Sequence, residues 1–260
     1  MTTPMPLRAT SYLARAYIRT WRASIAATFV NPTLYLLAMG VGLGSFINKS
    51  HGGAAALGHT SYLHYVAPGL AASAAAVAAA NEAMFPIMGA IKWQKTYYAM
   101  LATPLRVIDV LIGHLTWIGV RIAMAVSAYL IVMAAFGTIT SYEAIAIFPV
   151  GILTGAAFAT PLAAFAATQD SDGGFSLVFR LGVTPVFLFS GIFFPLSQLP
   201  AGMRVLAYLT PLWHGVALCR PLASGHVTAA GLVGHLSYLV AITAAGAGAA
   251  LFTFRRRLLV

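Results

Sequence analysis

Charged residues are scarce in this sequence. They make up 8% of its 260 residues, whereas a soluble domain carries about 25%, and so few charges do not cover the water-facing surface of a domain of this length. Apolar residues account for 60% of the chain, and the mean hydropathy is +0.86. The composition predicts an all-α, multi-pass membrane protein, with room for roughly six spans of about 20 residues each.

Motifs for catalysis and metal binding are also absent. The sequence contains neither G-x-x-x-x-G-K-[ST] nor H-E-x-x-H, so it predicts no phosphate-binding loop and no zinc site of that type. The single cysteine, Cys219, excludes a disulfide within the chain. His51 and His59 lack a third ligand at a fixed spacing, and we interpret them as part of a solvated loop. We therefore predict no catalytic residue, no metal site and no cofactor bound by this chain.

Six apolar runs are candidates for membrane spans. Asn31-Pro32 predicts a kink in the first run, and Pro149 and Pro161 predict kinks in the fourth. The second half of the chain does not repeat the first, so residues 1–260 are expected to form one transmembrane domain. The six predicted spans are residues 24–47, 62–90, 107–136, 144–168, 175–194 and 229–254.

Residues 1–23 precede the first run and mix apolar with basic side chains. Leu13, Ala16 and Tyr17 belong to an apolar set that recurs every three to four residues between arginines. This spacing predicts an amphipathic helix in the plane of the lipid headgroups. The alternative is a basic flank that only fixes the orientation of the first span.

Residues 195–225, between the fifth and sixth runs, contain too many prolines for one spanning helix and are too apolar for an ordinary loop. We expect short helices at the membrane edge, where irregular backbone is shielded by protein or lies at the interface. They either cap a path through the protein or form a passive surface plug. The candidate site residues in and beside this segment are Phe194, Pro195, Pro200, Leu206, Pro211, Trp213 and Arg220.

Residues 91–106 read IKWQKTYYAMLATPLR and separate the second run from the third. The segment is too charged for a span and too apolar for an idle loop. Thr103-Pro104 predicts the end of a short helix, because a residue before proline disfavours helical backbone. The alternative is a membrane-surface loop with aromatic anchors.

Three strings in this chain closely resemble those of ABC-2 type export permeases, in particular the NodJ-like and daunorubicin-exporter-like branch. The first is NPTLYLLAMGVGLGSFI in the first span, and the second is MLATPLRVIDVLIGHLTW after the second span. The third is a set of positions between the fifth and sixth spans: Ser190-Gly191, Phe194-Pro195-Leu196, Leu199-Pro200, Pro211-Leu212, Arg220 and Gly225.

The resemblance implies a bacterial plasma-membrane permease that begins with an elbow helix. It implies two cytoplasmic ATPase subunits, which bind ATP and Mg²⁺, and pairing with a second copy or a paralogous permease. The cargo of this branch is amphiphilic: lipo-oligosaccharides in NodJ-like members, and drugs and natural products in daunorubicin-exporter-like members. The segment after the second span matches the coupling helix that docks into the ATPase, with Trp93, Tyr97, Tyr98, Leu101, Thr103, Pro104 and Arg106 as the coupling residues.

The basic residues predict the orientation, because cytoplasmic loops carry the excess of lysine and arginine. Three of them, Lys49, Arg204 and Arg220, fall on one side of the predicted spans, which we assign to the outside. Both termini and the coupling segment are then cytoplasmic. The net charge of +10 is spread over the ends of apolar runs, which argues against a nucleic-acid partner. The cytoplasmic set is Arg8, Arg15, Arg19, Arg22, Lys92, Lys95, Arg106, Arg180, Arg255, Arg256 and Arg257.

Three ionisable residues, Glu82, His114 and Arg121, fall inside predicted spans, where a charge needs a partner or a cavity. Aligning the second and third spans as antiparallel neighbours predicts a contact between Glu82 and His114. Arg121 is expected deeper in the membrane and less able to reach Glu82. It would face either the transport path or a dimer partner, or it would be bonded to backbone carbonyls. These residues keep open the alternatives of an ion-coupled transporter or a membrane enzyme without an ATPase, although the absence of a repeat disfavours the former.

Overall fold

The computed structural model describes residues 5–19, 21–50, 57 and 60–259. His51 and His59 lie outside these ranges. The described residues form helices and connecting turns, with no strand among them, which confirms the prediction of an all-α membrane fold.

Five of the described helices are long and apolar enough to span a membrane. Their ends lie within about one helical turn of the predicted ranges. The first combines α2 (Trp21–Tyr35), η1 (Leu36–Leu43) and α3 (Gly44–Ile47), and the second combines α5 (Tyr62–Ala83), α6 (Phe85–Met88) and η2 (Gly89–Trp93). The other three are α8 (Val107–Ala135), η3 (Tyr142–Ala146) with α9 (Ile147–Thr168), and α14 (Ala229–Leu258).

The helix at the fifth predicted span is shorter than expected. The described residues therefore form five long apolar helices and one shorter one, not the six long helices predicted. Residues Gly173–Phe189 form one apolar helix from α10 (Gly173–Val178), η4 (Phe179–Val183) and α11 (Thr184–Phe189). The chain leaves the helical conformation at Ser190, because Gly191 adopts a φ of +80° that an α-helix does not contain. Residues 190–194, predicted to continue the span, instead form a bend.

Three of these helices contain π-helical turns: η1 in the first span, η2 at the end of the second and η4 in the short helix. A π-helical turn is wider than an α-helical turn and occurs often at functional sites. The chain continues as an α-helix directly after η1 and after η4, so neither π-helical turn ends its helix.

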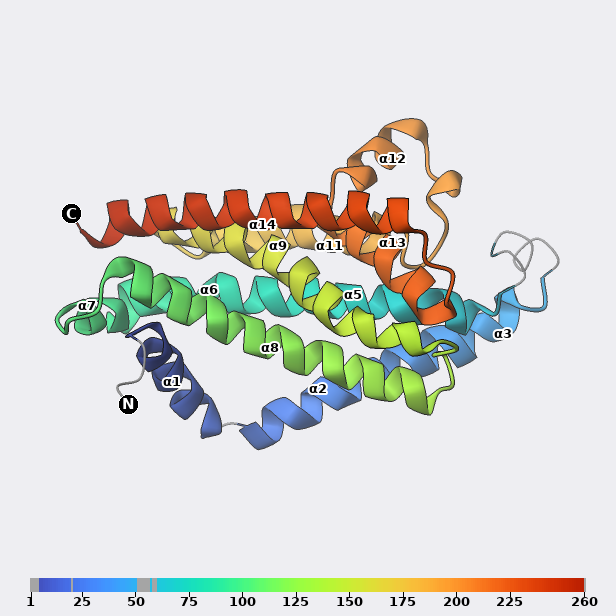
Figure 1. Cartoon of the computed structure of the whole chain (residues 1–260), viewed down its shortest axis with the longest axis horizontal. Coiled ribbons are helices and arrows are strands. Elements are labelled where there is room, and N and C mark those ends of the chain that lie inside the picture. The colour runs from blue at the N-terminus through green and yellow to red at the C-terminus, as the bar shows by residue number, and fades with distance from the viewer. Residues whose placement is uncertain (1–4, 20, 51–56, 58–59, 260) are drawn as a thin grey trace.

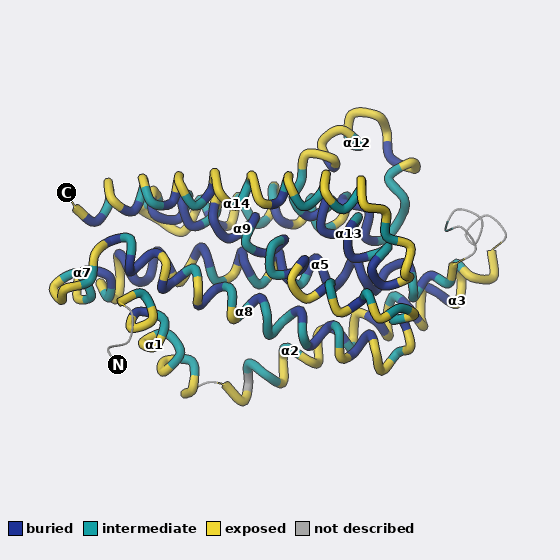
Figure 2. The backbone as a smooth tube through the Cα atoms, viewed as in Figure 1, coloured by how far each residue is buried: buried dark blue, intermediate teal, exposed yellow. Residues whose placement is uncertain are grey.

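Helices α5, α8, α9 and α14 pack against one another as the centre of the bundle (Figure 1). Small residues bring them close, as they do in other membrane proteins. A Cβ atom at Gly155 of α9 would lie 2.7 Å from Ile122 of α8 and 3.0 Å from the carbonyl oxygen of Ala75 of α5. Figure 2 shows α5 as the most continuously buried helix, whereas α12 is largely exposed.

Shorter helices flank the bundle at its two ends. Helix α1 (Met5–Ile18) and helix α7 (Thr96–Leu101) lie near both chain termini, at one end of the long axis (Figure 1). Three short elements follow the bend after α11: η5 (Leu196–Gln198), α12 (Ala201–Tyr208) and α13 (Pro211–Ser224).

Candidate functional site

Glu82 and Arg121 form an ion pair between the second and third spans. The Nε atom of Arg121 donates to Oε1 of Glu82 at 2.8 Å, and the two side chains keep 21% and 20% of their surface exposed. The predicted contact of Glu82 with His114 is therefore wrong at the level of side chains. The expectation that Arg121 is the less able of the two to reach Glu82 is also wrong.

The direction of side chains on antiparallel helices explains this pairing. Each Cα–Cβ bond tilts toward the N-terminus of its own helix. Helices α5 and α8 run in opposite directions, so the side chain of Glu82 leans toward Arg121 and the side chain of Arg121 leans toward Glu82. An alignment of residue numbers alone places them roughly 9 Å apart along the axis, and the two long side chains cover that offset.

His114 makes two other contacts near the ion pair, one with the backbone carbonyl of Glu82 and one with Tyr97. Pro86 has no N–H, so the carbonyl of Glu82 four residues earlier lacks its helical donor. The Nε2 atom of His114 lies 3.5 Å from this carbonyl oxygen and donates to it. The Nδ1 atom is then the acceptor, and the hydroxyl of Tyr97 lies 2.7 Å from it.

Helix α1 reaches the same ion pair from the outside of the bundle. The ring of Tyr17 lies over the guanidinium of Arg121, with 4.5 Å between the ring centroid and Cζ, an attractive cation–π geometry. Tyr17 also packs edge-on against Trp117 of α8, with ring centroids 5.5 Å apart. Nearer the terminus, Thr10 donates to the carbonyl of Gly113 at 3.0 Å. The amphipathic helix predicted within residues 1–23 is thus attached to α8 along its length.

The ion pair lies on the wall of a cavity of about 750 Å³. The cavity is bordered by α2, α5, α8 and the helix of η4 and α11. Its lining is largely apolar or neutral, and Glu82 and Arg121 are the two charged residues in it. Pockets for small ligands occupy about 300–1,000 Å³ and combine apolar walls with a few fixed polar groups. The geometry therefore fits an amphiphilic molecule, with one polar anchor opposite apolar walls.

The segment predicted to be a coupling helix forms the end of the bundle near both termini. Trp93 and Tyr98 expose 60% and 42% of their surface, so they are free to contact another protein. Leu101 is half-buried, and Thr103 and Pro104 are exposed at the turn that follows. Arg106 begins α8, where Asp109 accepts from its backbone N–H at 2.9 Å and from its Nε at 3.3 Å.

Tyr97 differs from its predicted role. Its side chain is 1% exposed and packs between His114 and Phe254 of α14. Burial raises the pKa of this phenol, so the hydroxyl keeps its proton for the bond to His114. Tyr97 thus anchors α7 to the bundle and does not supply the docking contact proposed from the sequence.

Comparison with known sequences shows which family this chain belongs to. Residues 9–222 match the sequence profile described as ABC-2 type transporter. The chain belongs to the ABC-2 type transporter family. It is 33% identical to nodulation protein J of Rhizobium leguminosarum bv. trifolii over 204 residues, which are 78% of this chain and 75% of that protein. It is 31% identical to nodulation protein J of Bradyrhizobium diazoefficiens over 264 aligned positions, which cover 98% and 97% of the two chains.

In this ABC-2 permease the proline-rich segment forms the short helices expected from the sequence. Pro195 and Pro200 immediately precede η5 and α12, and Pro211 is the first residue of α13. Phe194 is half-buried, whereas Leu206 exposes 67% of its surface.

Arg220 of the permease fastens this segment to the second span. Its Nη2 atom donates to the carbonyl of Gly191 at 2.8 Å, and its Nε atom donates to the carbonyl of Tyr65 at 3.2 Å. The guanidinium also lies 3.8 Å from the centroid of the Tyr65 ring. Arg220 therefore closes the bend that ends the short helix.

The apolar side chains of this segment, Phe194, Leu206 and Trp213, are predicted from the sequence to face the membrane core or a partner chain. The Trp213 ring instead packs against its own chain. Its centroid lies 4.6 Å from that of Tyr208 and 5.0 Å from that of His235 on α14. The reason is that Pro211 starts α13 with its first turn against α14.

A histidine pair next to Trp213 was missed from the sequence. The Nδ1 atoms of His214 and His235 lie 2.9 Å apart, and Nε2 of His214 lies 3.1 Å from the carbonyl oxygen of Tyr208. Tyr238 stacks on the His214 ring at 3.8 Å between centroids. Burial, followed by the neighbouring His235, lowers the pKa of His214, and the contact between the two rings ties α13 to α14. No sequence signal joins two histidines that are 21 residues apart.

Proposed function

We propose that this ABC-2 permease is the membrane subunit of an ATP-driven exporter that moves a bulky amphiphile out of the cytoplasm or the inner leaflet. The cavity of about 750 Å³ supports this most directly. Its apolar walls suit an acyl chain or an aromatic ring system, and the Glu82–Arg121 pair offers charge to a polar headgroup. The similarity to nodulation protein J favours a lipo-oligosaccharide over a drug or another natural product.

The partners follow from the same proposal. The exposed Trp93 and Tyr98 would enter a groove of a cytoplasmic ATPase, which would bind ATP and Mg²⁺. The cavity is bordered on one side by α2, whose outward residues are exposed apolar side chains such as Val30 and Leu34. A second copy of the chain or a paralogous permease would cover this side, with membrane lipids around the pair.

The orientation proposed for a bacterial plasma membrane places both termini and α7 in the cytoplasm. In the structure these three features lie at one end of the bundle (Figure 1). Eleven basic residues of the sequence lie on that side of the spans by our count, which agrees with the excess of positive charge in cytoplasmic loops.

Cysteine labelling in intact cells tests this orientation. A cysteine in place of the exposed Gln198 should react with a membrane-impermeant maleimide, and one in place of Gln169 should react only after permeabilisation. The native Cys219 gives little background, because it is buried and burial raises the pKa of its thiol to about 12, which suppresses the reactive thiolate. The reverse pattern of labelling would contradict the proposed topology.

Reconstitution tests the transport function itself. The permease and its ATPase in proteoliposomes should move a fluorescent lipo-oligosaccharide across the bilayer only with hydrolysable ATP. The same glycan without its acyl chain should not compete, because the apolar walls would bind nothing on it. Movement driven by a proton gradient with a catalytically dead ATPase would instead indicate an ion-coupled transporter.

A further inference from the structure

A second hollow of about 590 Å³ lies at the end of the bundle near the termini, away from the transport cavity. It is formed where the end of the second span meets the end of α14. Four cationic side chains, one tyrosine and one aliphatic residue line it: Ile91, Lys92, Lys95, Tyr98, Arg256 and Arg257.

The charges around this basic hollow are not balanced within the chain. The carboxylate of Asp170 accepts from Arg257 at 2.6 Å, and Lys92 donates to the carbonyl oxygen of Asp170. The hydrogen bond from Arg257 lowers the pKa of Asp170, so one negative charge is fixed here. Among the described residues, no ion pair holds Lys95 or Arg256. An anion in the hollow would supply the missing counter-charge.

The backbone at Lys95 supports a binding role. Lys95 has a φ of +51° and is the one residue other than glycine with a positive φ in the described part of the chain. This conformation is unfavourable for a residue with a Cβ atom, and such strain is concentrated at functional sites. It places Lys95 at the turn between η2 and α7, on the border of the basic hollow.

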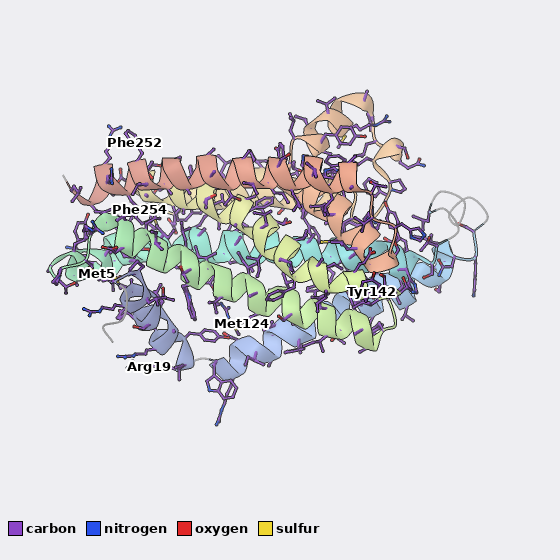
Figure 3. All side chains as sticks on the ribbon, viewed as in Figure 1. Met5, Arg19, Met124, Tyr142, Phe252 and Phe254 are labelled. Carbon is purple, nitrogen blue, oxygen red and sulfur yellow. The ribbon has the colours of Figure 1, made fainter. Side chains whose placement is uncertain are left out.

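A smaller hollow of about 360 Å³ adjoins the basic one and shares Arg256 and Arg257 with it. Its other lining residues are Ala167 and Thr168 at the end of α9 and Phe252 and Thr253 in the last turns of α14. Phe252 exposes 66% of its surface, whereas Phe254 two residues later is buried in the bundle (Figure 3). The two arginines therefore lie between the basic hollow and a smaller groove that the exposed Phe252 ring borders.

We propose that these two hollows bind an anionic phospholipid of the cytoplasmic leaflet. The phosphate would lie between Lys95 and Arg256, and an acyl chain would follow the groove beside Phe252. A free phosphate ion would use only the basic hollow, so the adjoining groove favours a lipid. Basic pockets between membrane helices on the cytoplasmic side bind anionic headgroups in other proteins. The inference uses the proposed orientation to name the leaflet and is independent of what is exported.

The test is lipid binding to the purified full-length permease without its ATPase. Native mass spectrometry with phosphatidylglycerol should show one tightly retained lipid per chain, and phosphatidylcholine should bind at least about tenfold more weakly, since each basic residue near a membrane surface contributes to anionic lipid binding. Lys95→Gln combined with Arg256→Gln should remove this preference. Phe252→Ala should weaken phosphatidylglycerol binding, but it should not change the affinity of the basic hollow for free glycerol 3-phosphate, which has no acyl chain.

A matched control is Arg8→Gln with Arg15→Gln, which removes two charges on the same predicted side and leaves both hollows intact. Equal loss of lipid in this control would show general charge attraction and overturn the site. Competition by glycerol 3-phosphate at the affinity of the lipid would indicate a phosphate site. Normal lipid binding by the Lys95/Arg256 variant together with loss of ATPase co-purification would make the hollow a protein-docking surface. If that variant does not fold, the fallback is a chain with Trp21→Phe, Trp117→Phe and Trp213→Phe, in which Trp93 is the one remaining tryptophan. Quenching by brominated phosphatidylglycerol, but not by brominated phosphatidylcholine, would then support the site, and equal quenching by both would contradict it.

Discussion

Arg121→Leu should lower the amount of permease in the membrane and abolish transport. The substitution leaves the carboxylate of Glu82 without its partner inside the bundle. Removing one member of a buried ion pair typically costs about 3–5 kcal/mol, and the partial exposure of this pair places the expected cost toward the lower end. The cation–π contact with Tyr17 is lost as well, which loosens α1 from α8. Membrane level, ATP turnover and transport should be measured separately.

The double variant Glu82→Leu/Arg121→Leu separates stability from transport. Replacing both members of a buried pair by apolar residues is often neutral or stabilising, so the double variant should return to nearly the wild-type membrane level. Transport should stay lost, because the cavity then has no charged group to hold the cargo. Transport that recovers together with abundance would make the pair purely structural. Arg121→Lys is the matched control, since it keeps the positive charge and loses the Nε contact.

Tyr98→Ala combined with Leu101→Ala should separate the permease from its ATPase. Truncating an aromatic anchor at an interface often costs about 2 kcal/mol or more, which corresponds to roughly 30-fold weaker binding. Trp93→Ala should act in the same direction, because Trp93 is the most exposed aromatic side chain of this segment. Co-purification of the two proteins and substrate-stimulated ATP turnover are the measurements.

Tyr97→Phe is the control for this docking experiment, one position from Tyr98. It removes the hydroxyl bonded to His114 and keeps the buried ring. The variant should lower the melting temperature of the permease without selectively weakening ATPase binding. Docking would be disproved if assembly and coupled turnover were unchanged in the Tyr98/Leu101 variant while the protein remained folded.

Much of the fold was predictable because membrane spans are defined by length and hydropathy. The long spans appear as long apolar runs, and Pro195, Pro200 and Pro211 indicate the short helices that follow the bend at Gly191. The length of the fifth helix was not predictable, because hydropathy continues through Phe193 and Phe194 while Gly191 turns the backbone. Apolar composition fixes where a chain can span but not where it bends.

The site was only partly predictable. Glu82, His114 and Arg121 were selected because ionisable residues inside spans are costly, but their partners depend on which way side chains lean between antiparallel helices. Tyr97 and Tyr98 look alike in the sequence, and only the rotation of α7 decides that one is buried and the other exposed. Pro86 is a usable signal in the sequence, because it has no N–H to donate to the carbonyl of Glu82 four residues earlier, and this carbonyl then needs another donor.

The π-helical turns η1 and η4 have a consequence for the length of the chain. Each corresponds to an α-helix into which one residue has been inserted without ending the helix. In a regular α-helix an extra residue would rotate everything beyond it by about 100°, whereas a π-helical turn takes up the extra residue within one wide turn. Helix α2, which leads into η1, and the turn η4 itself both border the cavity around Glu82 and Arg121. Single-residue insertions and deletions at η1 and η4 are therefore a route by which related permeases can turn a different set of side chains toward the cargo while the rest of the bundle keeps its register.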